Sequence, residues 1–207
     1  IDESINEKVI DLFHELQREP LPGMIEAVPA YSSITVYYDL LATRKKAPAA
    51  QPVVDWMKAK LDQRLQQPVP TNHTTNGELI NIPVCYEGEF APDLERLARE
   101  RNISPEEVVR IHTSKPYRVF MLGFLPGFAY MGELDERIAT PRKLQPVSVA
   151  AGSVGIAGKQ TGIYPLVSPG GWQIIGRTSL SLFNKEKEQI TLFKAGDSVQ
   201  FIPVSKD

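Results

Sequence analysis

The sequence has little of what several classes of protein require. Its 207 residues include one cysteine, Cys85, and three histidines, at positions 14, 73 and 112. A single cysteine excludes an internal disulfide. His14-Glu15 resembles the start of a zinc-binding helix motif, but Arg18 stands where that motif places its second histidine ligand. We therefore expect no metal site.

Neither charge nor hydropathy favours a nucleic acid or a membrane as partner. The formal net charge is −2, which gives no overall positive field to attract a nucleic acid. No apolar run approaches the roughly 20 residues of a membrane-spanning helix, and no signal-type segment is evident. Because a lone cysteine is typical of a reducing compartment, we expect a cytoplasmic protein.

What the sequence has in excess is glycine beside aromatic residues, concentrated in one stretch. Ten of the fourteen glycines lie between Gly123 and Gly176. Three blocks hold them: GFLPGFAYMG (123–132), GSVGIAGKQTGIYP (152–165) and SPGGWQIIGRT (168–178). Such glycines indicate tight turns or close backbone approach. Large rings beside them suggest a concave, partly apolar surface on a β scaffold.

The first part of the chain, residues 1–78, is predicted to form a small domain of helices and strands. Ser4 and Glu7 form a capping box for a first helix, which should end near Glu19. Two strands and a second helix follow, over residues 24–29, 33–40 and 52–67. The polar stretch after them reads as a linker.

The second part, residues 79–207, is predicted to form a separate β domain. It begins with a strand and two short helices, the second of which is capped by Ser104. From Tyr117 onward, short apolar runs separated by glycine and proline predict a β-barrel or sandwich. These runs include residues 154–156, 164–167, 180–183 and 198–204.

Three motifs bear on possible chemistry. The segment from Gly152 to Thr161 resembles a phosphate-binding loop, but five residues instead of four separate its outer glycines, and Gln160 replaces the Mg²⁺-binding hydroxyl. A glycine-bent pair of strands is the better interpretation. Cys85 lies in an apolar strand, which favours a buried small side chain over a nucleophile. His112 lies near a helix C-terminus, which favours its protonated form; a packing role and an acid–base role both remain open.

Cations and rings around the glycine blocks form the predicted binding groove. Arg142, Lys159 and Arg177 could together recognise a carboxylate or a phosphate. The aromatic residues stand at corners where the chain must turn, so some should line the groove. No catalytic residue is assigned. The candidate groove residues are His112, Phe124, Phe128, Tyr130, Arg142, Lys159, Gln160, Tyr164, Trp172 and Arg177.

These blocks resemble a known family. The segments that carry the resemblance are GFLPGFAYMGELDERIATPRK, AGSVGIAGKQTGIYPLVSPGGWQIIGRT and AGDSVQFIPV, and more loosely IEAVPAYSSITVYYD and IPVCYEGEFAPDLE. The family contains the B-type subunits of 5-oxoprolinase, the Kip-type (KipI) inhibitors of sporulation histidine kinases, and allophanate hydrolase subunit 1. It implies an α+β chain, with a small α/β ferredoxin-like N-terminal domain followed by a cyclophilin-like β-barrel. The family begins with a strand that we expect to be missing here.

The resemblance implies an enzyme component that is inactive alone. With a homologous C-type subunit and an A-type subunit, such a chain opens 5-oxo-L-proline to L-glutamate at the expense of ATP. Arg142, Lys159, Gln160 and Arg177 are then the candidate donors for charge that develops on the substrate. Whether ATP contacts this chain stays open. The alternative is a regulator that blocks autophosphorylation of a sensor histidine kinase by docking aromatic anchors on its dimerisation helices.

Overall fold

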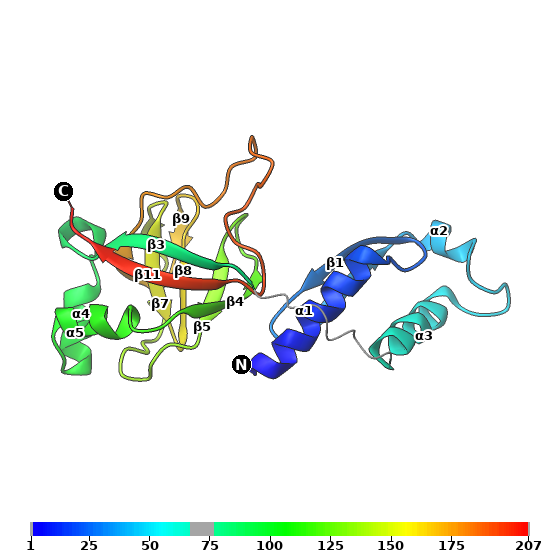
Figure 1. Ribbon diagram of the computed structural model, residues 1–207, viewed down its shortest axis with the longest axis horizontal. Helices are drawn as coiled ribbons and strands as arrows, with labels where there is room; N and C mark the ends of the chain where they lie inside the picture. Colours follow the sequence, from blue (N-terminus) through cyan, green and yellow to red (C-terminus); the bar gives the residue numbers. More distant parts are fainter. Residues whose placement is uncertain (1, 67–76, 207) are drawn as a thin grey trace. The chain divides into compact units, whose positions relative to one another are not determined.

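The computed structural model describes residues 2–66 and 77–206, and the chain divides into two compact units, Ile1–Asn76 and Gly77–Asp207 (Figure 1). The first unit contains α1 (Glu3–Arg18), the antiparallel hairpin of β1 (Met24–Pro29) and β2 (Ile34–Tyr38), α2 (Leu40–Arg44) and α3 (Val53–Gln66). Its core is small and apolar, because one face of α1 packs on the hairpin and on α3. The buried core residues are Leu12, Leu16, Leu21, Ala27 and Met57.

The start of α1 and the end of β2 differ from the prediction. Asp2, not Ser4, caps α1: its carboxylate accepts hydrogen bonds from the backbone N–H of Ser4 at 2.9 Å and of Ile5 at 3.2 Å. A charged oxygen at the positive end of the helix competes well with a hydroxyl. Similarly, β2 ends before Asp39, which caps the unpredicted helix α2 through the N–H of Ala42 at 2.8 Å.

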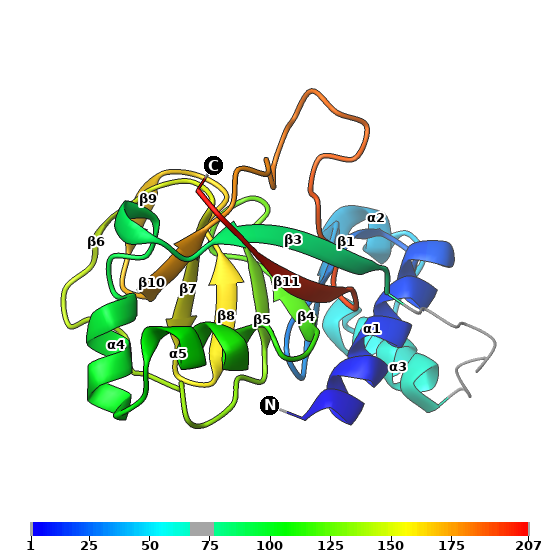
Figure 2. The same ribbon diagram turned by 60° about the vertical axis from the view of Figure 1, so that its left-hand side comes forward.

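A closed β-barrel forms the second unit (Figure 2). Around the barrel the strands run β10 (Gln173–Arg177), β3 (Leu79–Cys85), β11 (Ser198–Val204), β4 (Tyr117–Leu122), β5 (Ala129–Gly132), β8 (Gln160–Ile163) and β7 (Ser153–Ala157). The β3–β11 pair is parallel, and the other pairs are antiparallel. The predicted α+β class with a β-barrel is confirmed.

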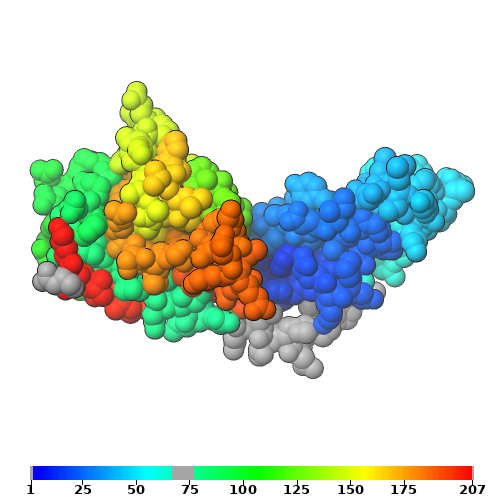
Figure 3. All heavy atoms as spheres, turned by 90° about the horizontal axis from the view of Figure 1, so that it is seen from above, coloured from blue at the N-terminus to red at the C-terminus, as the bar shows by residue number. Residues whose placement is uncertain are grey.

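Shorter elements surround the barrel. They are the 3₁₀ turn η1 (Gly88–Phe90), α4 (Leu94–Arg101), α5 (Pro105–His112), and a separate two-stranded sheet of β6 (Val147–Val149) and β9 (Ser168–Gly170). The segment around residues 140–150 (yellow-green in Figure 3) stands out from the surface of this unit. The loop after β10 (orange in Figures 1 and 2) extends away from the barrel.

Two of the four predicted runs named above are not strands. Residues 164–167 form the turn between β8 and β9, because Pro165 cannot donate a ladder hydrogen bond and Tyr164 is buried by ring packing instead. Residues 180–183 belong to the loop after β10, where a single bridge joins Phe183 to Thr191. By contrast, β11 has the predicted limits.

The barrel wall is buried on both of its faces where β5, β7, β8 and β10 lie side by side. Side chains alternate along a strand, so Val154 and Ile163 point into the barrel core while Ala157 and Ile174 join a second apolar cluster on the outer face. Val149 of β6 belongs to that outer cluster as well. The small β6–β9 sheet therefore contributes to a layer outside the barrel.

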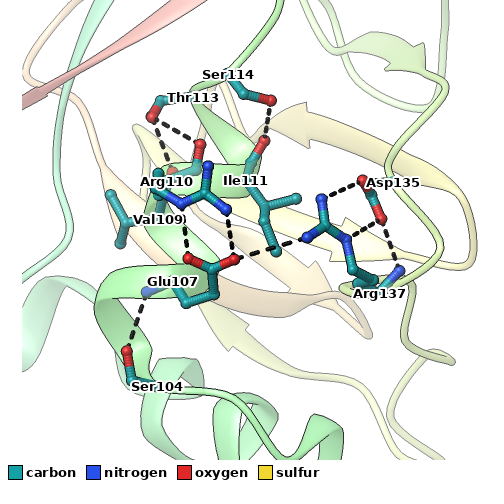
Figure 4. Close-up of polar contacts among 9 residues, drawn as sticks. All are labelled: Ser104, Glu107, Val109, Arg110, Ile111, Thr113, Ser114, Asp135 and Arg137. Atoms are coloured by element: carbon teal, nitrogen blue, oxygen red, sulfur yellow. Dashed lines mark hydrogen bonds and ion pairs between the residues drawn. The ribbon is translucent and has the colours of Figure 1, made fainter.

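Helix α5 is fixed at its start and tied to the loop after β5 (Figure 4). Ser104 Oγ accepts from the N–H of Glu107 at 3.2 Å, which confirms the predicted cap. The Glu107 carboxylate accepts two hydrogen bonds from Arg110 at 2.6 Å and lies 3.7 Å from Arg137. Hydrogen bonds from Arg137 lower the pKa of Asp135 to about 2. This chain of charges lies on the surface, away from the barrel core.

Candidate functional site

The five aromatic residues predicted to line a groove meet in one cluster, here called the aromatic cluster: Phe124, Phe128, Tyr130, Tyr164 and Trp172. Phe128 lies at its centre. Its ring centroid is 5.5, 4.9, 5.3 and 5.4 Å from those of Phe124, Tyr130, Tyr164 and Trp172. All four pairs meet edge to face, an arrangement that aromatic quadrupoles favour. The sequence blocks thus converge in space.

Most of the aromatic cluster is buried and does not form the wall of a groove. Phe128, Tyr164 and Trp172 are 1, 1 and 4% exposed and belong to the outer apolar cluster of the barrel. Tyr130 is half-buried. Only Phe124 is exposed, at 61%, on a backbone with the uncommon φ of 69°. The cluster therefore acts mainly as a second small core.

Glycine and rings alternate in the sequence because the rings lie directly on glycine backbone. A Cβ atom on Gly162 of β8 would lie 2.8 Å from the carbonyl oxygen of Ala129, 3.1 Å from the Trp172 ring and 3.2 Å from the Phe128 ring. No side chain fits there without displacing a ring or a strand. This close approach explains the glycine density that the sequence shows.

The three predicted cations do not converge. Arg142 Cζ lies 5.9 Å from the Trp172 ring, whereas Lys159, in the turn between β7 and β8, forms an ion pair with Glu136. Arg177, at the end of β10, lies opposite Ser153 in the β-ladder, and Ser153 is at the other end of β7 from that turn. The length of β7 alone separates the two ends by about 13 Å, at roughly 3.3 Å per residue. Each cation therefore serves a different place.

His112 lies apart from these groups, whereas Gln160 directly follows Lys159 in the chain. His112 is fully buried inside the barrel. Its Nδ1 lies 2.9 Å from the hydroxyl oxygen of Tyr86, and its Nε2 lies 2.9 Å from that of Thr161. Its ring stacks on Phe201 at 4.5 Å. Burial lowers the pKa of His112 to about 3, so the expectation of a protonated ring is wrong, because desolvation outweighs the helix C-terminus. Gln160 begins β8 and is half-buried.

An open pocket of about 1010 Å³ lies where β3, β10 and β11 end, here called the seam pocket. Arg177 is the one predicted site residue in its lining. No spacing in the sequence links residues near 85–90 with those near 205, so sequence reasoning missed the rest. The lining consists of Pro83, Cys85, Phe90, Ala151, Gly152, Pro165, Arg177, Thr178, Ser179, Leu180, Ser181, Val204, Ser205 and Lys206.

Two cations of the seam pocket share one aromatic ring. Arg177 Cζ and Lys206 Nζ lie 6.0 and 5.5 Å from the centroid of Phe90. Arg177 Nε donates to the carbonyl oxygen of Ala151 at 3.0 Å. Lys206 Nζ lies 3.0 Å from Glu89 Oε1, and this hydrogen bond lowers the pKa of Glu89 and raises that of Lys206. The pocket therefore carries positive charge on one side.

The wall of the seam pocket requires glycine at position 152. Gly152 has a φ of +80°, and a Cβ atom there would lie 2.1 Å from the carbonyl oxygen of Thr178. Its N–H donates to the carbonyl oxygen of Tyr164 at 2.7 Å. Through that bond the pocket wall adjoins the aromatic cluster.

The seam pocket lies at the least paired joint of the barrel. β10 and β3 are matched through one pair of residues, Arg177 and Cys85. By comparison, β3 and β11 are in register along their whole length. Cys85 is a free thiol, 8% exposed, in the pocket lining. Both residues of the single β10–β3 pair therefore line the pocket.

Within residues 2–66 and 77–206, no group of three or more His, Cys, Asp or Glu side chains could hold a metal ion. Nor does any helix in these two ranges have the length and apolar character to cross a membrane.

Comparison with known proteins places the chain in a family. Residues 1–193 match the model of the carboxyltransferase domain, subdomain C and D. The chain belongs to this family. Among curated relatives of this carboxyltransferase-domain chain, the B-type subunit of 5-oxoprolinase from Bacillus subtilis (strain 168) is 45% identical over 99% of the chain and 87% of the relative.

Two solved structures are similar to this chain in sequence and fold. The crystal structure of PH0987 from Pyrococcus horikoshii, a conserved uncharacterized protein, is 44% identical, with a TM-score of 0.61 over 100% of this chain and 90% of that one. The crystal structure of TTHA0988 is 33% identical, with a TM-score of 0.83 over 100% of this chain. This chain spans 38% of the TTHA0988 chain.

Proposed function

We propose that this chain is the B-type subunit of an ATP-dependent 5-oxoprolinase. It works with a homologous C-type subunit and an A-type subunit, and the complex opens 5-oxo-L-proline to L-glutamate. In that reaction the amide C–N bond of the ring breaks, while water supplies a hydroxyl to the carbonyl carbon and a proton to the nitrogen. The observation that carries the proposal is the 45% identity to a B-type 5-oxoprolinase subunit over nearly the whole chain.

The segment that resembles a phosphate-binding loop does not fit ATP. The segment from Gly152 to Thr161 contains the whole of β7, the turn after it and the start of β8. A helix N-terminus is what such a loop needs behind it. We assign ATP to another subunit of the complex.

The kinase-inhibitor alternative has less support from the site. It needs exposed rings as anchors, because hot-spot aromatics insert into a partner's surface. Of the four rings considered for that role, Phe128 and Trp172 are buried, Tyr130 is half-buried and Phe124 is exposed. We therefore retain the enzyme component, in the cytoplasm, as the proposed function.

Reconstitution tests the proposal. The chain is purified with its cognate A-type and C-type subunits, and release of L-glutamate from 5-oxo-L-proline is followed with and without ATP. We expect turnover only when all three subunits and ATP are present. The matched control is Lys187→Gln, an exposed cation outside the seam pocket, which should retain full turnover. Full activity of the A-type and C-type subunits without this chain would overturn the proposal.

A further inference from the structure

The seam pocket holds unused hydrogen-bond donors. Nε of Arg177 donates its hydrogen bond to the carbonyl oxygen of Ala151. None of the residues in the described ranges accepts a hydrogen bond from the two terminal Nη groups of Arg177. Lys206 has three N–H donors, one of which faces Glu89. A guanidinium presents a planar fork that matches the two oxygens of a carboxylate. The pocket can therefore bind an anion without breaking its own backbone contacts.

The charge of the pocket fits one negative charge better than several. Arg177 and Lys206 contribute two positive charges, and Glu89 offsets one of them. The Glu89–Lys206 pair is exposed on both sides, at 72 and 57%. Such pairs contribute little to stability, so an incoming anion can displace Glu89 easily. A nucleotide triphosphate carries more negative charge than this pocket balances.

The remaining lining is a mixture of hydroxyl groups and small apolar side chains. Ser179, Ser181 and Ser205 bring hydroxyls, while Pro83 and Val204 bring apolar surface. The volume of about 1010 Å³ lies at the upper end of the usual range for ligand pockets, which runs from roughly 300 to 1000 Å³. A small ligand with a carboxylate, an amide and a short apolar ring would find a partner for each of its parts.

We infer that the seam pocket binds a small carboxylate, with Arg177 and Lys206 contacting its oxygens and Glu89 competing with it for Lys206. The inference rests on the proposed function only in naming 5-oxo-L-proline, or its product L-glutamate, as that carboxylate. Arg177 and Lys206 bind and orient the ligand, and Phe90 holds both cations in place. Arg177 and Lys206 therefore raise the affinity for the ligand, whereas Glu89 lowers it.

Cys85 reports on occupancy of this pocket. It is the one cysteine of the sequence and part of the pocket lining, so alkylation by iodoacetamide, followed by mass, measures access to this place alone. The probes are 5-oxo-L-proline and L-glutamate, with inorganic phosphate and ATP in parallel arms. Affinity is measured independently by calorimetric titration. Both measurements are made on the full chain, and again on the chain mixed with its cognate subunits.

The carboxylates should slow alkylation, and three variants should shift their affinity in different directions. Arg177→Gln should weaken binding about tenfold or more, because a bidentate charge-assisted contact is lost. Lys206→Gln should weaken it by about threefold to tenfold, since one point charge is lost. Glu89→Gln should strengthen it by about twofold to fivefold, because an exposed competing ion pair is removed.

The controls separate this inference from the proposed function. Lys187→Gln, at an exposed lysine outside the pocket lining, should leave affinity unchanged, and circular dichroism should show that every variant is folded. Carboxylate binding that none of the three variants alters, or no binding with and without the other subunits, overturns the inference. So does protection of Cys85 by phosphate or ATP but not by the carboxylates. If binding follows the expected pattern while reconstituted turnover fails, the inference stands and the proposed function falls.

Discussion

The aromatic cluster and the seam pocket adjoin each other, yet they are built on opposite principles. The aromatic cluster buries Phe128, Tyr164 and Trp172 against glycine backbone, so these rings pack within the protein and do not face a ligand. The seam pocket leaves Arg177 and Lys206 beside an open volume, where packing is incomplete. Density of conspicuous residues in the sequence therefore marks the part that stabilises the barrel. The part suited to a ligand is assembled from inconspicuous residues.

The largest test of this comparison is Trp172→Ala. Removing a buried indole should lower the free energy of unfolding by about 3–5 kcal/mol, from lost burial and the cavity left behind. Urea unfolding followed by circular dichroism measures it. Phe124→Ala is the matched control, since its ring touches the same Phe128 but is exposed, and should cost less than about 1 kcal/mol. Equal costs for the two variants would show that the aromatic cluster is not a core.

His112→Gln tests the barrel core by pH. Below about pH 6.5 the unfolded chain binds a proton at His112, while the folded barrel excludes it until about pH 3. As the pH is lowered through that window, the free energy of unfolding should therefore fall by about 1.4 kcal/mol for each pH unit. The variant should be less stable at pH 7.5 by about 1–3 kcal/mol.

The readout is Trp172 fluorescence in a Trp56→Phe background, which follows the barrel unit alone because each unit holds one tryptophan. His112→Gln should flatten the dependence of stability on pH between 6.5 and 3. Parallel pH profiles for the two proteins would contradict a neutral buried ring.

Arg142→Gln tests the border between the two regions. Its guanidinium lies over Trp172 and not in the seam pocket. Loss of an exposed cation–π contact should lower the free energy of unfolding by about 0.5–1 kcal/mol, with carboxylate affinity unchanged. Urea unfolding and calorimetric titration measure the two quantities. A tenfold loss of affinity in this variant would mean that the binding surface extends over the aromatic cluster.

Lys159→Gln should have the smallest effect. Its ion pair with Glu136 is exposed on both sides, so the free energy of unfolding should change by less than about 0.5 kcal/mol. Thermal and urea unfolding at low and high salt are sufficient to measure this. A larger change that persists in high salt would show that the turn between β7 and β8 carries more of the barrel's stability than its exposure indicates.

The sequence predicted those features that local patterns determine. Ser104 before Pro105 and Glu107 predicted the cap of α5, and the run from Ser198 predicted β11, because caps and apolar runs depend on neighbours in the chain. The five rings of the aromatic cluster, which were predicted as groove residues, lie together. Their burial was not predicted, since a ring beside glycine can line a surface or pack on a strand. Whether these rings are exposed or buried depends on whether the β6–β9 sheet covers them.

The seam pocket could not be predicted, for a physical reason. Phe90 and Lys206 meet because the parallel pairing of β3 and β11 brings the ends of two distant strands together. Similarly, the predicted site cations are separated because β7 holds Arg177 and Lys159 at its opposite ends. One sequence shows which residues can bind an anion. Only the register of the strands decides which of them share a place.

The parallel pair of β3 and β11 also bears on how the protein is made. Leu79 pairs with Ser198 and Cys85 with Val204, so the first strand of the barrel can complete its pairing only when the last strand is present. During synthesis β3 leaves the ribosome with an open edge, and contacts of such long sequence separation form slowly. The barrel closes only after β11 has emerged, and the same event delivers Lys206 to Phe90. Until then the seam pocket lacks one of its two cations.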